Sequence, residues 1–166
     1  METVPTRVTE AKYAADISSI VEAQKRISSL AHRTPVLTSL SLDGLAGRSL
    51  YFKCENFQKG GAFKFRGACN AVFSLDDASA AKGVVTHSSG NHGAALSLAA
   101  KLRGIPAYVV IPKNAPKCKV DNVLRYGGEV IRSEPTVESR ESAAEKLVKE
   151  TGALLVHPYN NERIIR

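Results

Sequence analysis

Lys64 stands in a setting that differs from that of an ordinary surface lysine. It has a phenylalanine on each side, Phe63 and Phe65, and it follows the small residues 60–62, which allow a close approach of the backbone. It also leads into a segment, 66–73, whose alanine, valine and phenylalanine spacing predicts a buried helix. Apolar neighbours and the positive end of a helix both disfavour an ammonium, so the pattern favours a neutral amine of the kind that forms a Schiff base with an aldehyde cofactor. The alternative is a lysine at a helix start whose aliphatic stem packs between two rings.

A second group of reactive side chains lies at 87–93, with the sequence HSSGNHG, where a predicted strand turns into a predicted helix. In open parallel sheets, ligands bind just beyond the carboxyl ends of the strands. Free backbone N–H groups at the helix start and the hydroxyls of Ser88 and Ser89 would form an anion site there. The alternative is a serine that caps the helix, with glycines for the turn; for His92 alone, the alternative is a polar cap or a buried core residue.

These two runs carry a family resemblance. The sequence KCENFQ at 53–58, continued by GGAFKFRGA at 60–68, resembles the cofactor-lysine motif of the fold-type II pyridoxal-phosphate enzymes, in the branch of the serine racemases and threonine dehydratases. The run 87–93 follows at the distance that this family uses, and the resemblance extends from about Asp16 to the last residue. One departure is Ala62, where many relatives carry a serine, so a polar contact that relatives can make near the cofactor is absent.

The resemblance implies pyridoxal phosphate as cofactor and assigns roles residue by residue. Lys64 would hold the cofactor and act as catalytic base; Ser89 would be the catalytic proton carrier on the opposite face, because serine racemases have serine where threonine dehydratases usually have alanine. The other implied contacts are Phe63, Asn91 and Tyr159 for the cofactor; Ser88, Ser89, His92 and Arg140 for the substrate; and Ser39, Lys59 and Tyr126 for an activating nucleotide.

Each of these implied contacts has an alternative. Arg140 is equally consistent with a solvated helix arginine, and the three nucleotide positions hold residue types that are frequent on surfaces. An isolated aromatic such as Phe63 is more often core, and a contact of Tyr159 can run through its backbone. The resemblance also implies serine and threonine as substrates, a homodimer, and Mg²⁺ and ATP as activators of the intact enzyme.

The composition argues against several other classes of protein. The chain has 166 residues and no apolar run of membrane-spanning length, and residues 1–13 show neither a signal nor a transit pattern, so we predict a cytoplasmic protein without a membrane contact. The net charge of +7 does not indicate nucleic-acid binding, because the basic residues are spread along the chain without interleaved aromatics; it suits anionic ligands. Three scattered cysteines predict reduced thiols and no metal site in this chain, with Cys118, between two lysines, as the most reactive.

The second half of the chain alternates strands and helices. Each predicted helix ends at a glycine, and strands joined by helical crossovers of this length run parallel with helices on both faces of the sheet. We therefore predict a complete small α/β domain at 83–160. Its predicted strands are 84–86, 107–111, 129–132 and 153–157, and its predicted helices are 91–102, 115–126 and 136–150.

The first half offers fewer partners for its apolar faces. Asp16 is a predicted N-cap for an amphipathic helix that runs to residue 30 or 31. We predict that residues 1–82 are an incomplete part of a larger α/β cofactor-binding domain and that 161–166 begin the return to it. The other predicted pieces are a loose arm at 1–15, an extended piece at 36–38, a polar stretch to Gly47, a strand at 49–54 and a surface connection at 76–82.

The expected parent enzyme is a serine racemase with L-serine and L-threonine dehydratase activity. The sequence lacks the glycine-rich phosphate loop, the partner of the pyridine nitrogen and the acidic metal ligands that the family carries in its later part, so we expect the N-terminal half of such an enzyme, weakly active or inactive alone. The alternative is a catalytically silent truncated form that acts as an interaction module.

Overall fold

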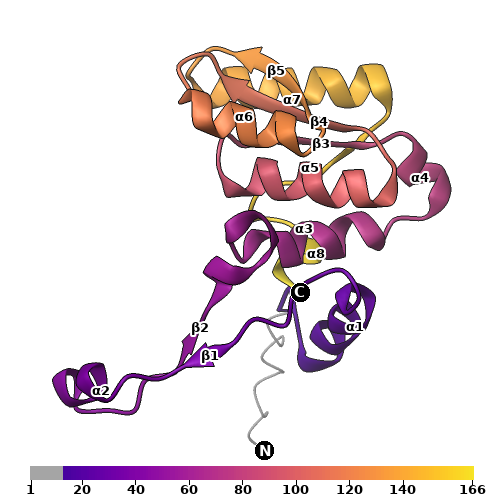
Figure 1. Ribbon diagram of the computed structural model, residues 1–166. Helices are drawn as coiled ribbons and strands as arrows, with labels where there is room; N and C mark the ends of the chain where they lie inside the picture. The colour runs from indigo at the N-terminus through magenta and orange to yellow at the C-terminus, as the bar shows by residue number, and fades with distance from the viewer. Residues whose placement is uncertain (1–12) are drawn as a thin grey trace, which may run out of the picture.

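A four-stranded parallel sheet forms the centre of the computed structural model, which describes residues 13–166 (Figure 1). The strand order is β5-β4-β3-β6, so the first strand of the sheet in the sequence lies between the second and the last. The predicted parallel α/β sheet is confirmed, although its last strand is shorter than 153–157. The strands are β3 (Val84–His87), β4 (Ala107–Pro112), β5 (Glu129–Ser133) and β6 (Leu154–Leu155).

Helices cover both faces of this sheet, as the sequence predicted. On one face, Val109 of β4 packs in a cluster with residues of α6 (Lys117–Arg125), and α5 (Asn91–Arg103) lies beside α6. On the other face, Val110 packs in a cluster with residues of α7 (Val137–Thr151). Successive side chains of a strand point to opposite faces, so the uninterrupted apolar run in β4 serves both layers.

The helix that Lys64 begins packs on α5, on the side away from the sheet (Figure 1). Within α3 (Lys64–Phe73), Phe65 and Val72 are fully buried and share the largest core cluster with Leu96 of α5. This helix therefore finds its main partner in the second half of the chain, outside the few partners that the first half was expected to offer. The contact between α3 and α5 could not be predicted from the sequence. Because α5 is rich in small residues and is buried on two sides, it has no polar face from which its orientation could be inferred. The predicted domain boundary between residues 82 and 83 stays a prediction, and this core cluster runs across it.

The N-terminal helix α1 (Ile17–Ile27) begins at the predicted cap. Asp16 Oδ1 accepts a hydrogen bond from the Ser19 backbone N–H at 2.7 Å. The helix ends three residues before the predicted limit, because the N–H groups of Leu30 and Ala31 both donate to the Ile27 carbonyl in a turn. The greater part of the predicted loose arm, residues 1–12, lies outside the described residues.

Residues 36–53 form an arm that extends away from the sheet (Figure 1). It contains the antiparallel pair β1 (Val36–Leu37), one residue shorter than the predicted extended piece, and β2 (Phe52–Lys53), much shorter than the predicted strand at 49–54. It also contains the helix α2 (Leu40–Ala46), within the segment predicted as a polar stretch to Gly47. Ser39 is the N-cap of this helix, and Gly47 ends it as a C-cap in the left-handed conformation. In the same way, the predicted surface connection contains α4 (Asp77–Ala81).

The last helix, α8 (Glu162–Ile165), returns to α3. The contact is close enough that a Cβ atom at Gly67 would lie 2.5 Å from the Ile164 carbonyl oxygen. Glycine at this position therefore lets the helix that carries Lys64 lie directly against the C-terminal backbone.

Candidate active site

Lys64 is held by a loop from the far end of the chain. It begins α3 directly after the short 3₁₀ turns η1 (Glu55–Phe57) and η2 (Lys59–Gly61). Its Nζ donates a hydrogen bond to the Pro158 carbonyl oxygen at 2.7 Å, although the two residues are 94 positions apart. Lys64 is thus a half-buried side chain with a fixed partner rather than a solvated surface lysine.

A cavity of about 510 Å³ opens beside this amine. Lys64, Phe63 and Tyr159 all line it, so three residues of the predicted cofactor site are brought together. The Phe63 ring is 60% exposed, and its centroid lies 5.3 Å from Lys64 Nζ. An aromatic face with free area beside a primary amine is suited to a flat ring that carries an aldehyde.

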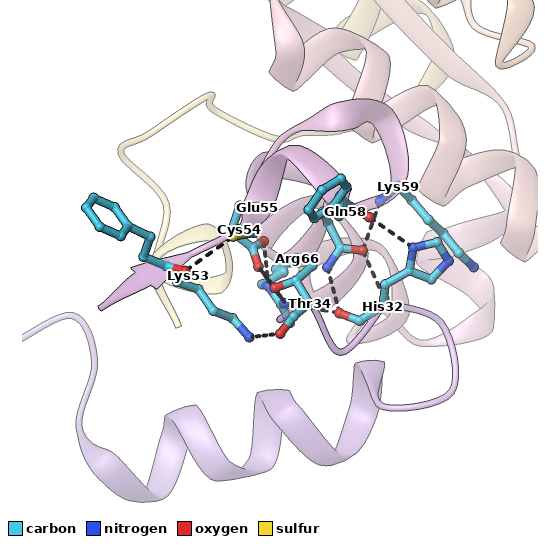
Figure 2. Close-up of polar contacts among 10 residues, drawn as sticks. His32, Thr34, Lys53, Cys54, Glu55, Gln58, Lys59 and Arg66 are labelled. Atoms are coloured by element: carbon cyan, nitrogen blue, oxygen red, sulfur yellow. Dashed lines mark hydrogen bonds and ion pairs between the residues drawn. The ribbon is translucent and has the colours of Figure 1, made fainter. Parts of the chain in front are cut away.

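An ion pair between Arg66 and Glu55 connects the start of α3 to the turns that precede Lys64. Arg66 Nε and Nη2 donate to the two oxygens of Glu55 at 2.8 and 2.7 Å, and Thr34 Oγ1 donates to Glu55 Oε1 at 2.6 Å (Figure 2). Both guanidinium bonds go to one carboxylate, the geometry in which an ion pair is strongest. This pair ties the first turn of α3 to η1 and to the segment before β1.

Gln58 makes a second tie between the same segments. It is 3% exposed; its Nε2 donates to the His32 carbonyl, and its Oε1 accepts from the His32 N–H, both at 2.9 Å (Figure 2). Together, His32, Thr34, Glu55, Gln58 and Arg66 form what we call the loop clamp. The loop clamp fixes the backbone of the turns that deliver Phe63 and Lys64 to the cavity.

Acid should weaken the loop clamp. The hydrogen bond from Arg66 is the main cause that lowers the pKa of the Glu55 carboxyl from 4.5 to about 2. A carboxyl whose pKa is lower in the folded state stabilises the protein above its unfolded pKa, and this stability is lost as the pH falls through the folded value. We expect the free energy of unfolding, measured by urea titration, to decline between pH 4.5 and pH 2 with a smaller slope in Glu55→Gln than in the native chain. Glu145→Gln, on the exposed face of α7, removes a carboxylate outside the loop clamp and is the control; equal slopes in all three proteins would contradict the assignment.

The serine and glycine turn between β3 and α5 leaves the start of α5 uncapped. Gly90 is the N-cap and, within residues 13–166, no side chain caps the first turn; Ser88 Oγ instead accepts the Gly90 N–H at 3.3 Å. The alternative of a helix-capping serine is therefore wrong. A Cβ at Gly93 would lie 2.4 Å from the Ser88 carbonyl oxygen, so glycine allows the turn to close. The helix start keeps free N–H donors beside two hydroxyls, as an anion site requires.

Ser89 and Asn91 line a second cavity, of about 230 Å³. Tyr126 lines it too, so one predicted nucleotide residue lies with two residues of the serine and glycine turn. The two basic side chains on its wall, Lys119 and Arg125, suit an anionic ligand. Lys64 does not line this cavity, so the structure does not bring Ser89 and Lys64 into one cavity, and their predicted division of labour stays a prediction.

His92 lies in the interior, as its alternative interpretation expected. It is 2% exposed, and its Nε2 lies 3.2 Å from the Val156 carbonyl oxygen. Burial is the main cause that lowers the pKa of His92 to about 4, so the ring is neutral at pH 7. Its Nδ1 has no hydrogen-bond partner in the part of the chain that the structure describes. A role of this nitrogen in binding substrate stays a prediction.

The remaining predicted residues lie outside both cavities. Arg140 is on α7, and its Nε donates to the Thr136 carbonyl at 3.3 Å. Ser39 caps α2 on the arm, and the Lys59 ammonium lies 5.9 Å from the centroid of the Phe65 ring. Within this chain, the three predicted nucleotide residues are therefore not gathered at one place.

Comparison with known proteins decides the family. A sequence model of the family described as "Pyridoxal-phosphate dependent enzyme" matches residues 27–166. The chain belongs to the pyridoxal-phosphate-dependent enzymes. Serine racemase from Arabidopsis thaliana is 72% identical over 154 residues, which are 93% of this chain and 46% of that protein. A β-hydroxyaspartate dehydratase from Paracoccus denitrificans is 55% identical over 153 residues, 92% of this chain and 49% of that protein.

The fold agrees with this family. The structure of maize serine racemase has a TM-score of 0.90 and 60% identity to this chain, and the match covers 92% of this chain and 46% of that one. The chain thus spans about half the length of the curated relatives it matches.

The residues around Lys64 fit the cofactor of this family. Lys64 offers a primary amine at the wall of the first cavity, and Phe63 and Tyr159 offer exposed aromatic faces beside it. Pyridoxal phosphate would be held by Lys64 through its aldehyde and by Phe63 against its ring.

The residues that hold the turns before Lys64 in place had no predicted role. Glu55, Gln58 and Arg66 lay inside the recognised motif without an assigned role, and only their spacing to a small-residue loop could have drawn attention to them. Pro158 could not have been found, because it acts through a backbone carbonyl far along the chain.

The helices and the cysteines bear on the predictions about membrane contact and thiol reactivity. No helix within residues 13–166 is long and apolar enough to cross a membrane. Cys118 is exposed, whereas burial raises the pKa of the Cys69 thiol to about 11, an order that agrees with Cys118 as the more reactive of the two.

Proposed function

We propose that this chain is the lysine-bearing part of a serine racemase that also removes water from L-serine and L-threonine. The observation that carries the proposal is the position of Lys64 Nζ, held by a backbone carbonyl at the wall of a cavity that Phe63 and Tyr159 share. The identity to serine racemase from Arabidopsis thaliana supports the choice of reaction within the family.

Pyridoxal phosphate, when bound, supplies the electron sink that stabilises negative charge at the substrate α-carbon. The chain's own residues then handle binding and proton transfer. The free N–H groups at the start of α5 and the Ser88 hydroxyl would bind the substrate carboxylate. The Lys64 amine would remove the α-proton from its own face, and the Ser89 hydroxyl would return a proton to the opposite face, which inverts the centre. If the β-hydroxyl instead leaves with a proton as water, serine becomes an enamine, whose imine form is hydrolysed by water to pyruvate and ammonia.

Three further properties are proposed for the whole enzyme: its oligomeric state, its location and its activators. We propose that the whole enzyme is a cytoplasmic homodimer that Mg²⁺ and ATP activate. The two basic side chains on the wall of the second cavity support the proposal that a nucleotide binds. The exposed apolar side chains of the arm, Leu40 at 90% and Leu45 at 85%, support the second candidate function, an interaction module without catalysis.

A chimera separates the two candidates. Residues 1–166 would be joined to the part of Arabidopsis thaliana serine racemase that follows its matched segment, and racemisation and pyruvate formation from L-serine would be measured for the chimera and for the chain alone. We expect both reactions in the chimera and little or none in the chain alone, because the chain spans about half the length of the relatives it matches. A folded chimera that binds pyridoxal phosphate and turns over no amino acid would favour the interaction module.

A further inference from the structure

The peptide group whose carbonyl accepts the hydrogen bond from Lys64 also donates its N–H to a histidine. His157 Nδ1 accepts two backbone hydrogen bonds, from the Tyr159 N–H at 3.3 Å and from the Asn160 N–H at 2.9 Å. The carbonyl of Pro158 belongs to the same peptide group as the Tyr159 N–H. In a trans peptide these two groups point in opposite directions. When the N–H points at the His157 ring, the carbonyl therefore points away from it, toward Lys64.

Packing fixes the ring that makes these bonds. The His157 ring lies edge to face against His87 of β3, with centroids 5.2 Å apart, and against Tyr159, with centroids 4.5 Å apart. Such contacts restrain a ring more than a loop residue in solvent would be restrained. From the sequence, His157 was predicted only as the last residue of the strand at 153–157.

We propose that His157 is a positioning residue, which acts through the 158–159 peptide to place the Lys64 amine at the wall of the first cavity. Its value for catalysis rests on the proposed function: an amine that must leave the cofactor and then act on the substrate gains from a fixed acceptor while it is free. The positioning itself is a property of the chain without cofactor.

The proposal requires an unprotonated Nδ1, because a protonated ring nitrogen cannot accept a hydrogen bond. The charged and titratable groups near the ring come from several elements: Lys64 of α3, His87 of β3, His92 of α5, Tyr159 of the same loop and, beyond His87, Arg140 and Glu141 of α7. Burial lowers the pKa of both His87 and His92.

The test uses the chain of residues 1–166 without cofactor, by nuclear magnetic resonance, in the native form and in two variants. His157→Leu removes the acceptor, whereas His157→Asn puts an amide oxygen where Nδ1 stood. The first readout is the protection of the Asn160 amide against hydrogen exchange; we expect a loss of about 5- to 10-fold in His157→Leu, the worth of one ordinary hydrogen bond, and little loss in His157→Asn. The second is the separation of the two Lys64 ε-proton signals, which should collapse in His157→Leu and persist in His157→Asn.

Several outcomes would overturn the proposal. Unchanged Asn160 protection in His157→Leu would show that the ring is not the acceptor. Lost protection with unchanged Lys64 signals would show that the peptide does not place the amine. Should His157→Leu fail to fold, as exchange of the Ala144 amide in α7 would reveal, the native chain decides: a scalar coupling across the hydrogen bond between the Asn160 amide nitrogen and His157 Nδ1 is expected, and its absence would overturn the proposal. Because none of these readouts involves cofactor or turnover, a failure of the proposed function would leave them unchanged.

Discussion

Lys64→Ala should abolish both racemisation and elimination in the chimera. The amine is the group that would bond to the cofactor aldehyde and remove the α-proton, so its loss removes two functions at once. We expect kcat/KM for L-serine to fall by on the order of 10³-fold or more in both reactions, measured as D-serine and as pyruvate. A protein that lacks this amine should also fail to retain pyridoxal phosphate on the chain after reduction with borohydride.

A second lysine serves as the matched control. Lys59 lies five positions earlier, and its ammonium approaches the face of the Phe65 ring without lining the first cavity. Because Lys59 is a predicted nucleotide contact, both variants are assayed without added nucleotide. Under this condition, Lys59→Ala should keep turnover of L-serine and reductive labelling of the chain close to native values. If Lys64→Ala retained turnover, or if labelling mapped to Lys59, Lys64 would not be the cofactor lysine and the proposed function would fail.

The sequence predicted the sheet better than it predicted the N-terminal half. In β3 and β4 most residue types favour a strand, and the glycine stops at Gly104 and Gly152 fix the ends of α5 and α7, so local signals and tertiary structure agree. The arm behaves differently. Its helix α2 exposes apolar side chains on a seven-residue element without a clear polar face, so a periodicity argument had nothing to detect.

The candidate site divides along the same physical lines. Lys64 and Phe63 at the first cavity could be predicted, because a lysine between two phenylalanines after three small residues is an uncommon pattern with a chemical reason. Glu55 and Arg66 also line this cavity, but no such pattern marks them. The parts that could not be predicted are those that act through the backbone or through another side chain. The Pro158 carbonyl has no side-chain signature, and the bonds from His157 depend on the direction of a loop that only the folded chain defines.

Ser89→Ala should separate the two reactions that Lys64→Ala removes together. Inversion needs a proton carrier on each face of the planar carbon, and one amine reaches only the face from which it approaches. Ser89 has a hydroxyl that does not cap α5, since the N-cap is Gly90 and no side chain in the described residues bonds to that first turn. We expect L-serine to D-serine conversion in the chimera to fall by on the order of 10²-fold or more.

Elimination is the internal control for this variant. Removal of water from L-serine begins with the Lys64 amine on its own face, so pyruvate formation from L-serine should largely survive in Ser89→Ala, whereas pyruvate formation from D-serine should fall together with racemisation. Ser88→Ala provides the matched comparison. The Ser88 hydroxyl accepts the Gly90 N–H, and its loss should weaken binding of the substrate carboxylate equally in both reactions. A parallel fall of both L-serine reactions in Ser89→Ala would mean that Ser89 holds the substrate and does not carry the proton. The wall that Ser89 shares with Asn91 and Tyr126 would then belong to ligand binding alone, and the racemase assignment would lose its second proton carrier.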